Sequence, residues 1–289
     1  MTAIPGWVIA RLAREALLED VGPGDLTTEA LIPAPARCTA RVTAGELLVV
    51  SGLDVATACF HAMDPAVRVT AACQEGSRLE RSDLIMTIAG RAHPILAAER
   101  VALNFLGRLS GIATLTRHCA DAAAGTKATI VDTRKTTPGL RLLERQAVLA
   151  GGGRNHRFGL FDAILVKDNH RTLCPDLEGA IRRIKEAYGK RYTIGVEVED
   201  LQTLETILNA GADLILLDNM TTDMLREAVR ARDARAIVPP PLLEASGGIT
   251  LASVASVAAC GVDRIAIGSL THGARSMDVS LHVTPESGA

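Results

Sequence analysis

Short apolar runs that alternate with helical segments fill most of the chain after residue 112, and they constrain its fold more than any other feature. The apolar runs lie at 128–132, 163–167, 194–198, 214–218, immediately before Ser246, and at 264–268. Apolar residues with helical spacing occupy segments between them, at 140–150, 200–209, 222–231 and 251–259. Strands that alternate with helices join by right-handed crossovers into a parallel sheet. With six or seven such units, the sheet can curl into an α/β barrel.

The residues before this region have a different pattern. Helical spacing at 7–19 predicts an amphipathic helix. Between 37 and 90, apolar runs shorten to strand length and glycines punctuate them, which predicts a small antiparallel sheet with helical cover. A further helix is predicted over 95–109. The chain is therefore expected to have two parts that fold by different rules.

The overall composition excludes several classes of function. A net charge of −2 gives no general attraction to nucleic acid or to an anionic membrane. Aromatic residues make up only 2% of the chain, so base stacking is not expected either. Six cysteines without a C-x-x-C pair predict reduced thiols, as in a cytoplasmic protein, rather than a zinc site. Charges within the first twenty residues argue against a signal peptide, and no apolar run is long enough to span a membrane.

Cationic side chains gather at the ends of the first two predicted barrel strands. Arg134 and Lys135 follow the strand at 128–132, and Lys167 ends the strand at 163–167. His156 and Arg157 lie on the loop before that second strand. Because the carboxyl ends of parallel strands meet at one edge of the sheet, these cations predict a local site for an anion.

Carboxylates and glycines lie at the ends of the later strands. Glu197 and Asp218 offer hard oxygen ligands, which suit a Mg²⁺ ion that also contacts phosphate oxygens. Glycine-bearing turns at 247–248 and at Gly268 can present backbone N–H groups to a phosphate. Taken singly, such residues are as often caps, turns or surface ion pairs. Their meeting at one edge of the sheet favours a functional site.

Arg100 adds a separate observation from the predicted helix at 95–109. Its neighbours one turn away are mostly apolar, namely Leu96, Ala97 and Leu103. Such an arginine can pair with Glu99 or pack along its own stem. An anionic partner is favoured here, because the guanidinium group suits bidentate recognition of carboxylate or phosphate.

With these residues in view, the chain resembles the quinolinate phosphoribosyltransferase family of type II phosphoribosyltransferases, also called nicotinate-nucleotide pyrophosphorylases. The resemblance rests on the sequences LLEDVGPGDLT at 17–27, ERVALNFL at 99–106, DTRKTTPG at 132–139, GGGRNHR at 151–157, KDNH at 167–170, Glu197, LDN at 217–219, EASGG at 244–248 and LTH at 270–272. DTRKTTPG and KDNH are the most specific of these. The chain departs from the family pattern at Arg171, where an aliphatic residue is usual, and at Gly273, where serine is usual.

The resemblance implies a fold and a reaction. The fold is α/β, with an N-terminal α/β sandwich domain at 1–111 and an incomplete α/β barrel of about seven strands at 112–270. A C-terminal segment at 271–289 returns to the N-terminal domain. The reaction joins quinolinate to 5-phosphoribosyl 1-diphosphate with Mg²⁺, and it yields nicotinate mononucleotide, diphosphate and CO₂ in NAD biosynthesis. The implied assembly is a cytoplasmic homodimer that shares its active sites.

The resemblance also implies roles for individual residues. Lys135, Lys167, Glu197 and Asp218 would be catalytic, and Glu197 and Asp218 would bind the metal. The residues implied to contact the substrates are Arg100, Thr133, Arg134, Lys135, His156, Arg157, Lys167, Glu197, Asp218, Ser246, Gly247, Gly248, Gly268 and His272. Arg100 would act from the partner subunit.

Three alternatives remain at the level of sequence. The first is a paralogue of the same fold that uses another acceptor or serves metal transport, against which the intact KDNH and the full set of cations argue. The second is a type I phosphoribosyltransferase, which the segment at 216–222 resembles only faintly, without the second acidic residue and the closing glycine of that class. The third is a non-catalytic barrel that binds a phosphorylated metabolite, for which two added carboxylates would be unnecessary.

Overall fold

The computed structural model describes residues 4–286, which form two compact units. The first unit contains the residues up to 115, residues 138–152 and the residues from 274 onward. The second contains residues 116–137 and 153–273. The domains expected from the sequence are divided at residues 112 and 271. The two compact units differ from them chiefly because the segment 138–152 belongs to the first unit.

The first unit is built on an antiparallel sheet with the strand order β12-β1-β5-β3. Its strands are β1 (Arg37–Ala44), β3 (Arg68–Ala71), β5 (Leu84–Arg91) and β12 (Val279–Pro285). A short pair, β2 (Leu48–Val49) and β4 (Arg78–Leu79), is also antiparallel. The small antiparallel sheet predicted between 37 and 90 is thus confirmed, and the C-terminal strand β12 completes it beside β1.

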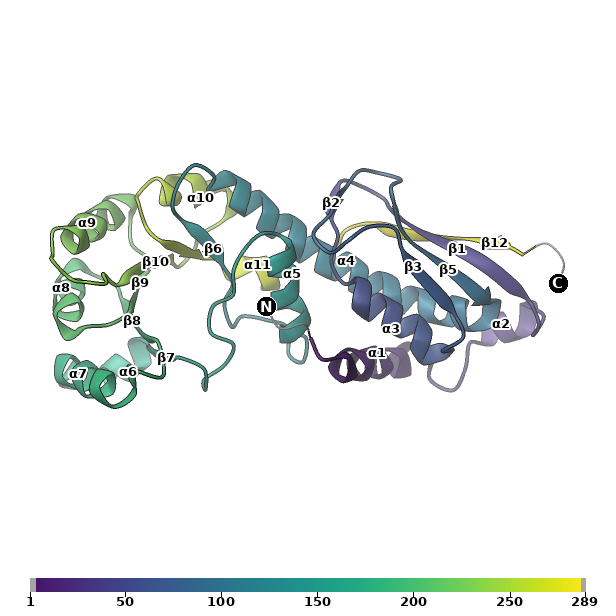
Figure 1. Cartoon of the computed structure of the whole chain (residues 1–289), viewed down its shortest axis with the longest axis horizontal. Coiled ribbons are helices and arrows are strands. Elements are labelled where there is room, and N and C mark those ends of the chain that lie inside the picture. Colours follow the sequence, from purple (N-terminus) through teal and green to yellow (C-terminus); the bar gives the residue numbers. More distant parts are fainter. Residues whose placement is uncertain (1–3, 287–289) are drawn as a thin grey trace. The chain divides into compact units, whose positions relative to one another are not determined.

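One face of this sheet carries the apolar core of the first unit. Along β1, alternate residues are buried, as a strand with one covered face requires. They pack in one cluster with apolar residues of α1 (Gly6–Val21), α3 (Leu53–Met63) and α4 (Ala92–Ala122), and these three helices lie on the same face of the sheet in Figure 1. Helix α4 begins in this unit, which also contains α2 (Leu26–Leu31) and α5 (Arg141–Ala150).

Helix α4 differs from the prediction. The helix expected over 95–109 runs for 31 residues, through Gly107 and Gly111. Glycine weakens a helix, which is why the pattern indicated an end near 109. Here the glycines allow the C-terminal segment to approach: a Cβ at Gly111 would lie 1.9 Å from the carbonyl oxygen of Arg275. The backbone N–H of Met277 also donates to the carbonyl oxygen of Gly107 at 2.9 Å.

The second unit is a parallel α/β sheet with the strand order β6-β11-β10-β9-β8-β7. Its strands are β6 (Thr129–Val131), β7 (Ile164–Val166), β8 (Ile194–Val198), β9 (Leu214–Asp218), β10 (Leu242–Ser246) and β11 (Arg264–Ala266). A single parallel bridge joins Val131 to Arg154 on the other side of β6. All six predicted strands are confirmed. The sheet has six strands where about seven were expected, and with its helices it matches the incomplete α/β barrel.

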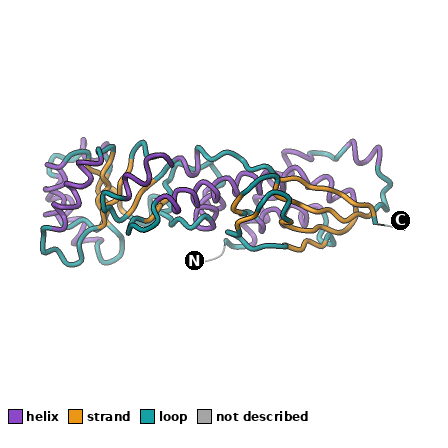
Figure 2. The backbone as a smooth tube through the Cα atoms, turned by 90° about the horizontal axis from the view of Figure 1, so that it is seen from above, coloured by secondary structure: helices purple, strands orange, loops and turns teal. Residues whose placement is uncertain are grey.

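Helices cover the outer side of this sheet, and at the left end of Figure 2 they (purple) lie along one side of its strands (orange). They are α6 (Asp168–Thr172), α7 (Leu177–Tyr188), α8 (Leu201–Ala210), α9 (Thr222–Asp233), α10 (Leu251–Ala258) and α11 (Ser269–His272). Asp176, Asp200 and Thr221 begin three of them, and each accepts a backbone N–H of the first turn. Within residues 4–286, no helix combines the length and apolar character needed to cross a membrane.

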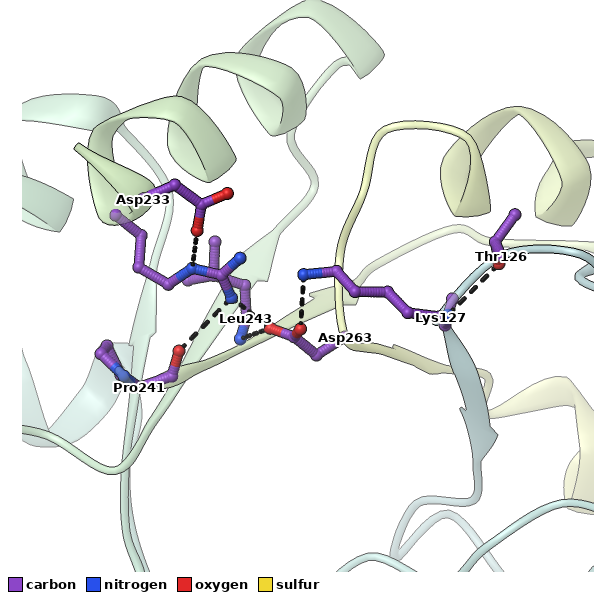
Figure 3. Close-up of polar contacts among 8 residues, drawn as sticks. Thr126, Lys127, Asp233, Pro241, Leu243 and Asp263 are labelled. Atoms are coloured by element: carbon purple, nitrogen blue, oxygen red, sulfur yellow. Dashed lines mark hydrogen bonds and ion pairs between the residues drawn. The ribbon is translucent and has the colours of Figure 1, made fainter. Parts of the chain in front are cut away.

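A partly buried ion network connects residues at the amino-terminal edge of the sheet (Figure 3). Asp263, just before β11, pairs with Arg232 of α9 and with Lys127 just before β6, the latter at 2.8 Å. It also accepts the backbone N–H of Leu243 at 2.8 Å. Burial alone raises the pKa of Asp263, but these donors outweigh it and leave the pKa below its usual 3.8. The network therefore holds an ionised carboxylate at the edge opposite the polar strand ends.

Candidate active site

A cavity of about 590 Å³ lies at the carboxyl ends of the strands of the second unit. Parallel strands bring their ends to one edge, so residues from distant parts of the sequence meet there. Every sequence-predicted site residue except Arg100 lines this cavity. These residues are Thr133, Arg134, Lys135, His156, Arg157, Lys167, Glu197, Asp218, Ser246, Gly247, Gly248, Gly268 and His272.

Arg100 belongs to the first unit and is not among the residues that line the cavity. Its side chain is exposed on α4. Within residues 4–286, no carboxylate forms an ion pair with it. The arginine thus remains available at the surface of the chain, and its anionic partner stays a prediction.

Cationic and acidic side chains line the cavity in equal number. The cavity lining contains four cations, Arg134, Lys135, Arg157 and Lys167, and four carboxylates, Asp168, Glu197, Asp218 and Glu244. The predicted cations and the predicted carboxylates Glu197 and Asp218 thus meet in one cavity, and Asp168 and Glu244 are two further carboxylates that were not predicted. Acidic residues at the ends of β8, β9 and β10 share the edge with the cations.

Lys167 and Glu197 form an ion pair within the cavity. Lys167 follows β7 directly, and Glu197 lies on the neighbouring strand β8, where Val166 pairs with Val196. Glu197 is only 4% exposed, so the ammonium group compensates a carboxylate that has little contact with water. Both residues were predicted to contact ligands separately, and here each is the other's partner.

Arg134 and Arg157 both line the cavity, and their positive charges repel each other. Burial lowers the pKa of Arg157 below its usual 12.5, and repulsion from Arg134 lowers it further, against the attraction of Asp162. Arg157 also donates to the carbonyl oxygen of Ala163 at 3.3 Å. Two cations in such proximity are stabilised by an anion with more than one charged oxygen. The Arg134–Arg157 pair therefore suits a carboxylate or phosphate ligand.

The glycine turns have conformations that favour glycine. Gly247 and Gly248 have φ angles of 90° and 60°, which side chains rarely adopt. A Cβ at Gly247 would lie 2.7 Å from the backbone nitrogen of Asn219. At Gly268, a Cβ would lie 3.0 Å from the Lys135 side chain and 3.3 Å from His272 Nε2. A larger residue at either place would distort the turn or narrow the cavity.

The carboxylates suit a metal ion only together with a further oxygen donor. Within the part of the chain that the structure describes, no three His, Cys, Asp or Glu side chains are grouped to hold a metal. Glu197 and Asp218 nevertheless line one cavity, and Asp218 accepts a hydrogen bond from Asn219 Nδ2 at 2.7 Å. Mg²⁺ often binds to one or two carboxylates plus substrate phosphates. The donor set therefore fits Mg²⁺ that is bound together with a phosphorylated substrate.

Several lining residues were not predicted as site residues. They are Leu165, Asp168, Leu216, Asn219, Glu244, Ile249, Thr250, Ala266 and Ser269. Glu244 could have been found, because it lies two residues before Ser246 on the same strand and hence on the same face. Asp168 could also have been found, because it directly follows Lys167 in the KDNH sequence.

Comparisons with known proteins agree over nearly the entire chain. The family model described as "Quinolinate phosphoribosyl transferase, C-terminal domain" matches residues 112–282, and the N-terminal domain model matches residues 25–110. The nicotinate-nucleotide pyrophosphorylase [carboxylating] of Mycobacterium leprae is 42% identical over 271 residues, which cover 93% of this chain and 94% of that protein. A protein of Bacillus subtilis named as a probable enzyme of the same kind is 39% identical over 96% of this chain and 93% of its own length.

Solved structures give the same result for the fold. NadC from Streptococcus pyogenes superposes with a TM-score of 0.92 at 36% identity, over 99% of this chain and 100% of that chain. The nicotinate-nucleotide pyrophosphorylase from Francisella tularensis has a TM-score of 0.90 at 33% identity, over 98% of both chains. The matched domains, the relatives and the fold lead to one conclusion: this chain belongs to the quinolinate phosphoribosyltransferase family of enzymes.

Proposed function

We propose that this enzyme transfers the phosphoribosyl group of 5-phosphoribosyl 1-diphosphate to quinolinate, in NAD biosynthesis. The products are nicotinate mononucleotide, diphosphate and CO₂. The observation that carries the proposal is that an arginine pair and a separate set of carboxylates line one cavity. Its volume, about 590 Å³, lies in the range of small-molecule sites.

The arginine pair supports a role in binding quinolinate. This substrate carries two neighbouring carboxylates, and burying either without a cation would cost several kcal/mol. Arg134 and Arg157 would bind these carboxylates, with His156 beside them. The positions of Lys135, His272 and the turns at Gly247, Gly248 and Gly268 favour contacts with the phosphate of the phosphoribosyl donor, together with Thr133 and Ser246.

The carboxylates support a role on the donor side of the cavity. Glu197 and Asp218 would hold Mg²⁺ and orient the ribose and diphosphate. When bound, Mg²⁺ neutralises the charge that develops on the leaving diphosphate. Lys167, which pairs with Glu197 in the structure, would also offer its ammonium group to a substrate oxygen. With a cation beside it, the buried carboxylate of Glu197 is compensated.

The reaction then requires orientation more than covalent chemistry from the protein. The bond between C1 of the ribose and diphosphate breaks, and the pyridine nitrogen forms a new bond to C1. The quaternised ring nitrogen next withdraws the electrons of the adjacent C–CO₂⁻ bond. CO₂ leaves, and a proton takes its place on the ring. The clustered cations and carboxylates stabilise these changes of charge.

We further propose that the enzyme is a cytoplasmic homodimer in which Arg100 completes the site of the other subunit. The support for this part is that Arg100 is exposed on α4 in the first unit, while the other substrate-binding residues line a cavity of the second. Two-fold dimers are also the commonest assembly. Six free cysteines are compatible with a reducing compartment.

The decisive experiment compares quinolinate with nicotinate as acceptor. Diphosphate release is measured with the phosphoribosyl donor and Mg²⁺ for each acid. Nicotinate lacks one carboxylate, so part of the Arg134–Arg157 pair would lose its counter-ion, and kcat/KM should fall by ~10³-fold or more. Comparable kcat/KM for the two acids would refute the assignment. Binding of both substrates without turnover would instead indicate a non-catalytic barrel.

A further inference from the structure

Glu244 is a buried carboxylate at the floor of the cavity. It is 0% exposed, and neither of its oxygens accepts a hydrogen bond within the described residues. It lies two residues before Ser246 on β10, paired in register with Leu216 of β9. A buried carboxylate without a partner costs several kcal/mol, so this position needs a compensating group. The closest group of that kind is the ring of His156, whose Nε2 lies 3.2 Å from Glu244 Oε1, while Arg264 is 4.0 Å away.

The contacts of His156 define which ring nitrogen carries the proton. Its Nδ1 accepts the backbone N–H of Arg157 at 2.7 Å. A ring nitrogen that accepts a hydrogen bond has no proton, so the neutral ring carries its proton on Nε2, the atom that faces Glu244. The backbone N–H of His156 also donates to Asp132 Oδ1 at 2.7 Å. Backbone and ring are thus both held, and the ring in turn holds the backbone of Arg157.

We propose that Glu244 is a positioning residue whose carboxylate, 3.2 Å from His156 Nε2, attracts the proton on that nitrogen and so fixes the orientation of Arg157. The line of contacts runs from the Glu244 carboxylate through the His156 ring to the backbone N–H of Arg157. Glu244 lines the cavity, but its oxygens are buried, so its proposed effect on a substrate runs through His156 and Arg157. Its kinetic effect rests on the proposed function and falls on quinolinate rather than on the phosphoribosyl donor. Its effect on the histidine ring does not depend on that function.

The direct test is ¹⁵N NMR of the histidine ring nitrogens near neutral pH, with His156 assigned from the signals lost in His156→Gln. In the wild-type protein we expect the Nε2–H tautomer at His156. In Glu244→Leu, which removes the acceptor, we expect a mixture of tautomers. In Glu244→Gln, the amide oxygen can still accept, so the Nε2–H form should persist. An Nδ1–H tautomer in the wild-type protein overturns the proposal, whether or not any variant folds.

Kinetics provide the second readout. Loss of a residue that orients a ligand-binding group typically costs ~10–100-fold in affinity or activity. Glu244→Leu should therefore raise KM for quinolinate by ~10-fold or more, with Glu244→Gln closer to wild type. Binding of the phosphoribosyl donor, measured by calorimetry, should not change. In the double variant with His156→Gln, the loss should be no greater than that of His156→Gln alone, because the two residues act in series. Losses that multiply would show independent roles and overturn the proposal.

Asp263→Asn is the matched control. Asp263 is another largely buried carboxylate that contacts β10, through the N–H of Leu243, but from the opposite edge of the sheet. Its variant should lose stability and keep both the His156 tautomer and the KM for quinolinate. If Asp263→Asn changes the His156 tautomer and the KM for quinolinate as Glu244→Leu does, the cause is a general destabilisation of β10, and the proposal fails. If the wild-type enzyme does not turn over quinolinate, the proposed function fails while the NMR result still decides the role of Glu244.

Discussion

Gly111 lies in helix α4 at a place that has no room for a side chain. A Cβ there would lie 1.9 Å from the carbonyl oxygen of Arg275. This contact is with backbone, so no side-chain rotation can relieve it. We therefore expect Gly111→Ala to force the C-terminal segment away from α4 and to destabilise the first unit.

Two opposing effects set the magnitude. Helix propensity alone favours alanine over glycine by ~1 kcal/mol. Overpacking a close contact typically costs ~1–3 kcal/mol. Displacement of the segment also threatens the 2.9 Å hydrogen bond from Met277 to Gly107, and a buried donor left without a partner costs a further ~1–3 kcal/mol. The steric terms exceed the propensity gain, so the free energy of unfolding should fall by ~1–5 kcal/mol.

Denaturant unfolding of the wild type and Gly111→Ala measures this change, with Gly6→Ala as the control. Gly6 is also helical, but no atom of residues 4–286 outside its own helix and chain neighbours lies within 4 Å of the place its Cβ would take. The control should be unchanged or slightly more stable. Limited proteolysis should cut the C-terminal segment faster in Gly111→Ala only. A Gly111→Ala protein that is more stable than wild type by the propensity difference would refute the packing described here.

Three further results are expected. Asp218→Asn should weaken binding of the phosphoribosyl donor with Mg²⁺ and leave quinolinate binding to the free enzyme nearly unchanged, as calorimetric titration of each can measure; equal losses would contradict a metal role. Arg100→Ala and Lys167→Ala should each lose ~10²–10³-fold or more in kcat/KM. When the two variants are refolded together, random pairing makes half of the dimers hybrids, and each hybrid has one intact site. About a quarter of all sites should then be native. No recovery of activity despite subunit exchange would place the action of Arg100 within its own chain. Hydrogen bonds from Arg275 and the Asp278 N–H lower the pKa of Glu46 from 4.5 to about 2. The stability that these bonds contribute is therefore complete above pH 4.5 and lost as the pH falls toward 2. In Glu46→Gln, the free energy of unfolding should depend less on pH in that range, and an unchanged pH dependence would contradict this.

The strands of the second unit could be predicted because each is a short apolar run with a polar end. That pattern is local, and parallel topology then brings the polar ends to one edge without further information. The end of α4 could not be predicted in the same way. Whether Gly111 breaks a helix or admits another segment depends on Arg275, which lies far away in the sequence.

Within the site, the residues could be predicted but their pairing could not. That Lys167 meets Glu197 depends on the register of β7 against β8 and on the side-chain conformations. The buried position of Glu244 likewise depends on the ring of His156, from a loop many residues away. Sequence patterns identify the edge at which side chains meet, while their mutual contacts arise only from the packed geometry.

The pairing of β12 with β1 has a consequence for the order of synthesis. Ala40 pairs with Val283, so all residues up to β12 must leave the ribosome before the first sheet acquires its last strand. Until then, one edge of β1 exposes unpaired N–H and C=O groups, which can pair with other chains. The second unit is synthesised before β12, and all six strands of its sheet precede β12 in the sequence. Although domains commonly fold in the order of translation, here the sheet that is begun first is completed last.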